Sequence, residues 1–233
     1  MSTLKEKLLT TLYPHHCFLC DAVLPLERHL CADCLRDAPY VFPPVCPMCG
    51  RGEDVCICGR HTHAYERCIS PFYHEGMVQG SILRLKQRYD TVVAAGFAAE
   101  MAEVIRREYG GIAFDFVTSV PLHKKDLRAR GFDQAKGLAE ALAARLGLPY
   151  VATLTKITHT LPQKELTAVR RRGNLLGVFD VTAQVEGRTI LLVDDVITTG
   201  STLDECAKML KIFGAEEVYA VTAAAAGLKK DGE

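Results

Sequence analysis

Eight of the ten cysteines in this sequence lie within residues 17–58, in four closely spaced pairs. Three pairs have the spacing C-x2-C and the fourth is C-x-C. Such pairs suit tetrahedral zinc, because a two-residue spacer lets both thiolates face one ion about 2.3 Å away. We therefore predict one or two structural zinc ions, held by Cys17, Cys20, Cys31, Cys34, Cys46, Cys49, Cys56 and Cys58.

The spacing of the pairs leaves the assignment of ligands to ions open. We favour the first four cysteines for one ion and the last four for the other, although a cross-braced arrangement fits the spacing too. An iron–sulfur cluster is the alternative, since four thiolates also suit one. His61 and His63 follow the last pair and are interpreted as surface histidines. Cys68 and Cys206 are interpreted as core thiols.

A second group of residues with chemical potential lies in the segment ILLVDDVITTGSTL, residues 190–203. An apolar run predicts a buried strand that ends at Val193, and the adjacent carboxylates of Asp194 and Asp195 follow it. A Thr-Thr-Gly-Ser-Thr turn then opens a predicted helix, whose free N–H groups, hydroxyls and positive dipole end suit a phosphate. Gly200 permits a close backbone approach. The carboxylates can accept hydrogen bonds from ribose hydroxyls and attract Mg²⁺.

The same segment lacks two familiar nucleotide-binding patterns. It has no G-x4-G-K-[ST], so it is not the phosphate loop of a nucleoside triphosphatase, and no G-x-G-x-x-G, which removes the usual dinucleotide fingerprint. An ordinary strand followed by a helix capped by Ser201 or Thr199 would explain the hydroxyl residues. It would not explain two adjacent acids directly after four apolar residues, which favours the ligand site.

The elements that must position these residues alternate along the chain after residue 67. Because strands that are apolar on both faces alternate with helices, we predict an α/β fold with a parallel sheet flanked by helices. Ligands of such sheets lie at the carboxyl ends of strands. We place the boundary between a small cysteine-rich zinc-binding domain, residues 1–66, and the α/β domain, residues 67–233. The main predicted strands cover residues 114–120, 152–157, 188–193 and 217–222, and the main predicted helices cover residues 92–109, 131–146 and 201–213.

Several motifs together resemble the ComF/GntX family of type I phosphoribosyltransferases, which is linked to competence and DNA uptake. They are LLVDDVITTGST, the VPL…RGFDQ stretch of residues 120–134, and the Q-x2-L-x4-R-x2-N…F stretch that begins at Gln163. The cysteine-rich region resembles the family's zinc region. Asp133 stands where the family usually has Asn, and Val178 where Ala is usual. The resemblance implies a type I phosphoribosyltransferase-like sheet that binds phosphoribosyl pyrophosphate (PRPP) with Mg²⁺.

The resemblance also implies roles for single residues. Asp194 and Asp195 would contact the ribose hydroxyls and help to place Mg²⁺, while Arg171, on a lid over residues 158–174, would stabilise the departing pyrophosphate. The phosphate of PRPP would lie against Val196, Ile197, Thr198, Thr199, Gly200, Ser201 and Thr202. The loop that receives pyrophosphate would comprise Val120, Pro121, Leu122 and Lys124.

Two functions remain open from the sequence. One is an enzyme that transfers the phosphoribosyl group from PRPP to an acceptor and releases pyrophosphate. The other is a non-catalytic protein that grips single-stranded DNA or a nucleotide and works with the DNA-uptake machinery. The mixed basic and aromatic segment of residues 84–89 suits the second, although a helix with a solvated face explains this segment equally well. The balance of 28 Lys+Arg against 28 Asp+Glu argues against strong non-specific DNA binding.

Composition excludes other classes of protein. With 48% hydrophobic and 24% charged residues, the sequence is that of an ordinary folded domain rather than a disordered chain. No apolar run approaches the roughly 18–20 residues that span a bilayer. The first residues lack the apolar core of a signal peptide, so we expect a cytoplasmic location.

Overall fold

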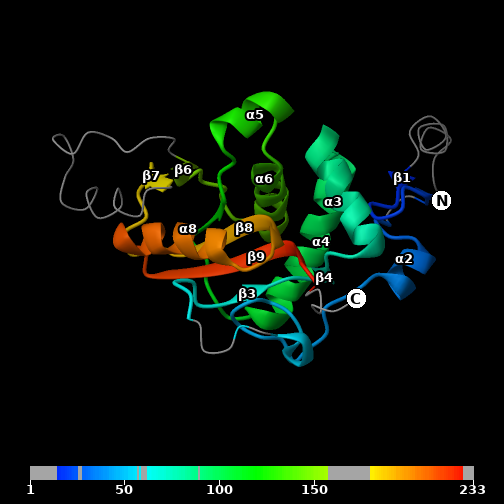
Figure 1. The fold of residues 1–233 in the computed structure, drawn as a ribbon, viewed down its shortest axis with the longest axis horizontal. Coiled ribbons are helices and arrows are strands. Elements are labelled where there is room, and N and C mark those ends of the chain that lie inside the picture. Colours follow the sequence, from blue (N-terminus) through cyan, green and yellow to red (C-terminus); the bar gives the residue numbers. More distant parts are fainter. Residues whose placement is uncertain are drawn as a thin grey trace, which may run out of the picture.

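The computed structural model describes residues 15–25, 28–56, 58, 62–88, 90–156 and 179–227. Its central element is a parallel sheet, in which β8 and β9 lie side by side through the middle of the molecule (Figure 1). The strand order is β3-β9-β8-β5, and β4 also pairs with β9. The parallel sheet that the sequence predicts is thus confirmed. The strands are β3 (Cys68–Ile69), β4 (Phe72–Tyr73), β5 (Phe116–Ser119), β8 (Thr189–Ile197) and β9 (Glu217–Ala225).

The two central strands are longer than the sequence predicts. β8 does not end at Val193 but continues through both acids to Ile197, and β9 runs on to Ala225. The extra residues of the two strands pair with each other, so their backbone groups form hydrogen bonds at a depth where water could not replace them. The alanines at the end of β9 are fully buried, and their small side chains let the layers on both faces approach the sheet closely.

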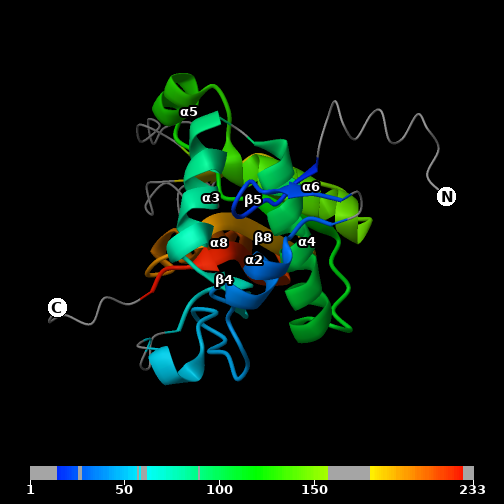
Figure 2. The ribbon, with the colours of Figure 1, turned by 90° about the vertical axis from the view of Figure 1, so that its right-hand side faces the viewer.

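Helices cover both faces of the sheet, as predicted. Figure 2 shows α4 and α6 on one side of β8, with α8 on the other. The apolar side chains accordingly form two clusters, one shared by α3, α4 and α6 and one beneath α8. None of the described helices combines the length and apolar character that crossing a membrane requires. The helices are α3 (Gly76–Arg88), α4 (Thr91–Glu108), α5 (Lys124–Arg130), α6 (Gln134–Leu146) and α8 (Ser201–Ile212).

The helix predicted over residues 131–146 begins three residues later, at Gln134. Gly131 instead ends α5, because its φ of +80° lets it close the helix with its N–H donating to the Leu127 carbonyl. Asp133 then caps α6 by accepting from the N–H of Lys136. A glycine and an acid therefore separate two helices where the apolar pattern alone indicates one.

The remaining elements are short. The strand predicted over residues 152–157 is observed as β6, which forms an antiparallel pair with β7. Most of the other short elements belong to the cysteine-rich region, where spacing of thiols rather than hydrophobic periodicity governs the chain. The short elements of the cysteine-rich region are β1 (His15–His16), β2 (Val23–Leu24), α2 (Ala32–Asp37) and the 3-10 turn η1 (Glu53–Val55). The antiparallel pair of the α/β domain consists of β6 (Leu154–Lys156) and β7 (Phe179–Val181).

The cysteine-rich region packs directly on the α/β core. The Phe18 side chain is fully buried, and its ring meets that of Phe97 in α4 edge to face, with centroids 4.9 Å apart. Its backbone carbonyl accepts hydrogen bonds from Ser81 and Arg84 of α3. The domain boundary at residue 66 stays a prediction, but the two sides of it share one apolar cluster.

Two helical glycines offer a matched test of this packing. A Cβ at Gly96 would overlap the Phe18 ring, whereas a Cβ at Gly80, on the exposed side of α3, would meet nothing within 4 Å. We expect Gly96→Ala to destabilise the protein by about 1–3 kcal/mol, because the core must shift to admit the methyl group. Gly80→Ala should instead stabilise it by up to about 1 kcal/mol. Urea unfolding measures both, and equal effects would contradict the packing of Phe18 on α4.

Candidate functional site

The candidate site lies at the carboxyl end of β8, where the strand passes into the turn of residues 198–202. We call these residues the phosphate turn. Gly200 is the N-cap residue of α8 and has a φ of +82°. Because glycine has no side chain, no N-cap side chain accepts a hydrogen bond from the first turn of this helix. The first N–H groups of α8 are therefore available to an anion, apart from a long contact of 3.4 Å from the Ser201 N–H to Thr199. The turn and the adjoining strand line one hollow, formed by Asp194, Val196, Ile197, Thr198, Gly200, Ser201, Thr202 and Leu203.

The two adjacent acids point in different directions. Successive side chains of a strand face opposite sides of the sheet, and only Asp194 lines the hollow beside the phosphate turn. The Asp195 carboxylate pairs with the ammonium of Lys86 in α3, with Nζ 3.0 Å from Oδ2, and accepts a 3.1 Å hydrogen bond from Gln134 of α6. The structure therefore joins Asp194 to the turn and Asp195 to the helices on the other face.

The pKa of Asp194 reflects its burial and its closeness to Asp195. Burial raises its pKa well above the ordinary 3.8, and the charge of Asp195 raises it further. A hydrogen bond from the Asp195 N–H, 2.8 Å from Oδ1, and the charge of Lys86 offset only part of this. Among the described residues, no cation forms an ion pair with Asp194, so its ionised form lacks a compensating charge there. A bound cation would supply one, and a carboxylate beside a hydroxyl-rich turn fits Mg²⁺, which takes one or two carboxylates together with phosphate oxygens.

The predicted pyrophosphate loop lies at the same edge of the sheet, because Val120 follows β5 and its N–H donates to the Val193 carbonyl of β8. The Leu122 N–H is already used, since it donates to Asp133 Oδ2 at 3.1 Å. Asp133 therefore ties this loop to the start of α6, and the loop offers an anion fewer backbone donors than the resemblance implies. Pro121 has no N–H to offer.

Some predicted site residues cannot be placed. Arg171 and the whole lid over residues 158–174 lie outside the described residues, as does His61. Lys124 begins α5, but its side chain is not among those described.

Lys86 and Gln134 are the site residues that sequence reasoning missed. Lys86 belongs to the segment of residues 84–89, which the sequence explains equally well as a nucleic-acid surface or as a solvated helix face. In the structure Arg84 is used by the cysteine-rich region, where it donates to the Phe18 and Leu19 carbonyls, and Arg88 pairs with Asp90 at 3.5 Å. All three cations of this segment are thus paired within the protein. One signal was available, since Lys86 directly follows the buried Leu85 and so borders the apolar stripe of α3.

Lys86 also contributes to the lowered pKa of a neighbouring histidine, His74. Burial lowers the pKa of His74 below 6.5, the charge of Lys86 lowers it further, and Asp195 opposes them. We expect Lys86→Met to raise the His74 pKa towards its ordinary value, since the opposing cation is lost and Asp195 is left less neutralised. An NMR titration of the imidazole measures this, with the exposed Lys208→Met as control. An unchanged His74 would show that Lys86 does not face this edge of the sheet.

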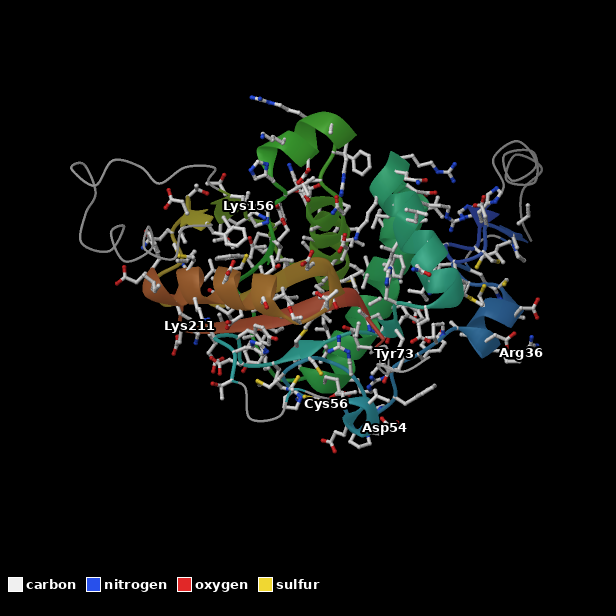
Figure 3. All side chains as sticks on the ribbon, viewed as in Figure 1. Arg36, Asp54, Cys56, Tyr73, Lys156 and Lys211 are labelled. Carbon is white, nitrogen blue, oxygen red and sulfur yellow. The ribbon has the colours of Figure 1, made fainter. Side chains whose placement is uncertain are left out.

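The cysteines gather into the two groups that the sequence favours, the first cluster (Cys17, Cys20, Cys31, Cys34) and the second cluster (Cys46, Cys49, Cys56, Cys58). Within each, all sulfurs lie within 4.8 Å of one another. Two separations, between Cys20 and Cys31 and between Cys49 and Cys56, are 3.7 Å. Four thiolates about 2.3 Å from one tetrahedral ion would be about 3.8 Å apart, so both clusters fit zinc. In Figure 3, Cys56 marks the second cluster below the sheet, and Arg36 marks α2 of the first cluster on the right.

His63 is not the surface histidine that the sequence suggests. Its side chain is 13% exposed, stacks on the Tyr65 ring at 4.8 Å between centroids, and lies 3.7 Å from Asp204 of α8. A Cβ placed on Gly200 would lie 3.5 Å from the His63 ring and 2.8 Å from the Tyr65 hydroxyl. The segment that follows the second cluster therefore lies against the phosphate turn.

Comparison with known proteins identifies family matches for both the cysteine-rich region and the α/β region. Residues 131–231 match the family model "Phosphoribosyl transferase domain", and residues 8–70 match "Double zinc ribbon domain". The chain is 32% identical over 215 residues to the DNA utilization protein YhgH of Salmonella typhi, which covers 88% of this chain and 94% of that protein. It is 26% identical over 217 residues to competence protein ComFC of Bacillus subtilis strain 168, with 83% and 88% covered. The chain belongs to the ComF family of type I phosphoribosyltransferase-like proteins.

Among solved structures, the glutamine PRPP amidotransferase of B. subtilis aligns with 59% of this ComF-family chain and 30% of its own length, at 19% identity and a TM-score of 0.40. The family model for zinc ribbons and the two sulfur clusters together support structural zinc in this ComF-family protein.

Proposed function

We propose that this ComF-family protein binds PRPP with Mg²⁺ at the phosphate turn, transfers the phosphoribosyl group to an acceptor, releases pyrophosphate, and acts in the cytoplasm. One observation carries the proposal: Asp194 and the phosphate turn line a single hollow at the carboxyl edge of a parallel sheet. Ligands of such sheets bind at this edge, and the open start of α8 supplies the donors that a phosphate needs.

The residues would divide the ligand between them. The 5′-phosphate would accept hydrogen bonds from the first N–H groups of α8 and from the hydroxyls of Thr198, Thr199, Ser201 and Thr202. Asp194 would hold Mg²⁺ or accept from the ribose hydroxyls. Asp195 would keep its orientation through Lys86 and Gln134, which already bind it. The pyrophosphate would lie towards Val120, Pro121 and Leu122, across the same edge of the sheet.

Transfer of the phosphoribosyl group would require two further features of the site, a cation at the pyrophosphate and the exclusion of water. When pyrophosphate leaves C1 of the ribose, positive charge develops on the sugar and negative charge on the leaving group. Cations must therefore meet the pyrophosphate, and water must be kept from C1. Arg171 is our proposed cation, carried by the lid over residues 158–174. Mg²⁺, when bound, would neutralise part of the pyrophosphate charge.

Handling of single-stranded DNA without turnover is the second candidate. It is favoured by the names of the relatives, a DNA utilization protein and a competence protein. Because residues 84–88 have paired cations, we place the DNA surface of this second candidate at α5, where Lys125 and Arg128 are exposed. On this view the DNA-uptake machinery would be the partner.

One pair of measurements separates the two functions. The enzyme is expected to release pyrophosphate from PRPP in the presence of Mg²⁺, faster when an acceptor amine or base is added. The DNA-binding protein would show single-stranded DNA affinity that falls steeply with salt, since counterions are released on binding. Either function could include binding of PRPP at the phosphate turn, and isothermal titration with PRPP tests this step. No heat of PRPP binding, with or without Mg²⁺, would refute the proposed site.

A further inference from the structure

A buried arginine connects the second cluster to the phosphate turn. Arg51 lies between Cys49 and Cys56 in the sequence and is only 3% exposed. Its Nη2 donates to the carbonyl of Thr198 at 2.6 Å and to that of Ile197 at 3.5 Å, while its Nε donates to the carbonyl of Ala226 at 2.8 Å. One guanidinium thus holds the end of β8, the first residue of the turn and the residue after β9.

The backbone of Arg51 is in turn fixed by the second cluster. The Cys46 N–H donates to the Arg51 carbonyl at 2.7 Å, and the Gly50 N–H donates to the Cys46 carbonyl at 2.9 Å, which closes the loop that carries two of the thiols. Gly50 has a φ of +66°, and a Cβ there would lie 3.0 Å from the Cα of Ile69 in β3. The loop therefore packs closely on the sheet, and zinc bound at the second cluster would hold it in this position.

A second contact joins the same two places. The hydroxyl of Tyr65 donates to the carbonyl of Met48, which lies between Cys46 and Cys49, at 2.5 Å. The same hydroxyl would lie 2.8 Å from a Cβ on Gly200. Arg51 lies in the loop of residues 46–51 and Tyr65 is hydrogen-bonded to it, so both contacts with the phosphate turn depend on where that loop lies.

The charge of Arg51 points to an anion at the turn. Within the part of the chain that the structure describes, its hydrogen-bond partners are carbonyl oxygens. Four thiolates around one zinc ion would leave a net negative charge on the second cluster, which would balance part of the charge of Arg51. A phosphate in the hollow lined by Thr198, Gly200 and Ser201 would bring negative charge close to this guanidinium.

We propose that Arg51 is a positioning residue of the phosphate turn, and that through it zinc binding at the second cluster and anion binding at the turn stabilise each other. The proposal rests on the proposed function, since it takes the turn to be a phosphate site. Because coupling between two sites is reciprocal, a phosphate ligand must strengthen zinc binding by the same factor by which bound zinc strengthens binding of the ligand.

Ribose 5-phosphate is the probe, because it occupies the turn without needing a pyrophosphate site. The affinity of the full-length zinc protein is measured by titration calorimetry, for wild type, Arg51→Lys and Arg51→Met. We expect a loss of about tenfold to a hundredfold for Arg51→Met and a smaller loss for Arg51→Lys, which keeps the charge but not the fork of donors. Arg36→Met, at an exposed arginine of α2, is the matched control and should bind as wild type does.

Zinc release to a chromogenic chelator supplies the readout that a merely structural residue would not change. Saturating ribose 5-phosphate should slow release of one of the two zinc ions in wild type, and this protection should vanish in Arg51→Lys. Failure of wild type to bind ribose 5-phosphate would refute the phosphate site itself. Binding to wild type with unaltered zinc release, and equal affinity in Arg51→Lys, would overturn the coupling and leave the phosphate site standing.

Discussion

Asp194→Asn is expected to abolish PRPP binding and, at the same time, to make the protein more stable at neutral pH. The carboxylate is the group of the hollow that would meet Mg²⁺ or the ribose, so its loss should weaken binding by about a hundredfold or more. Asparagine keeps an oxygen for the N–H of Asp195 but removes a charge that burial and Asp195 make unfavourable. Few other substitutions would separate function from stability so clearly.

The pH dependence of this effect has a definite sign. Since the pKa of Asp194 is raised in the folded protein, the folded state holds a proton that the unfolded state releases above about pH 4. The wild-type protein therefore loses stability as the pH rises from there through the raised pKa, and Asp194→Asn does not. The difference in Tm should be near zero at pH 4 and grow with pH, by about 2–4 °C for each kcal/mol.

Calorimetric melting across pH, together with PRPP titration, measures both halves of the Asp194 prediction. Asp33→Asn, at an exposed carboxylate of α2, is the control and should leave both binding and the pH profile unchanged. A less stable Asp194→Asn protein at pH 8, or one that still binds PRPP, would show that Asp194 is not the strained ligand group of the hollow.

Loss of zinc from the first cluster is expected to have the largest effect on stability. Cys17 and Cys34 belong to the same buried cluster as Phe18 and Phe97, so releasing the metal would open the face of the sheet that α4 covers. Zinc contributes about 10–16 kcal/mol to the folding of small zinc peptides. Even a fraction of this in Cys34→Ser should lower the Tm by roughly 10 °C or more.

The neighbouring residue provides the control for Cys34→Ser. Leu35 lies in the same helix but is 62% exposed, so Leu35→Ser should change stability by no more than about 0.5 kcal/mol. Metal analysis should find one zinc fewer in Cys34→Ser and an unchanged content in Leu35→Ser. A cysteine variant that melts as wild type does, with its metal content intact, would contradict structural zinc at the first cluster.

Much of the fold could be predicted because its signals are local. The apolar run of residues 189–193 and the alanine-rich stretch of α4 each carry their own periodicity, and glycines such as Gly147 mark where helices end. The two groups of cysteines also follow from spacing within a short segment. In each case the residues that decide the structure are neighbours in the sequence.

What could not be predicted depends on distant partners. The continuation of β8 through Asp195 requires a matching continuation of β9, and nothing near Asp195 in the sequence indicates it. Lys86 is 109 residues from Asp195, so its ion pair is visible only once α3 lies over the strand. Arg51 likewise resembles an ordinary loop residue until the ends of β8 and β9 are beside it.

The position of β9 between β3 and β8 constrains how this protein is made. Residues 68–69 leave the ribosome long before the strand against which they pair, residues 217–225. The cysteine-rich segment can therefore bind its metal during translation, but the part of the sheet that it packs on forms only after residues 217–225 have emerged. Because such long-range parallel pairing is slow, the nascent protein should expose the apolar residues of β3, Cys68 and Ile69, until β9 has been made and has paired with them.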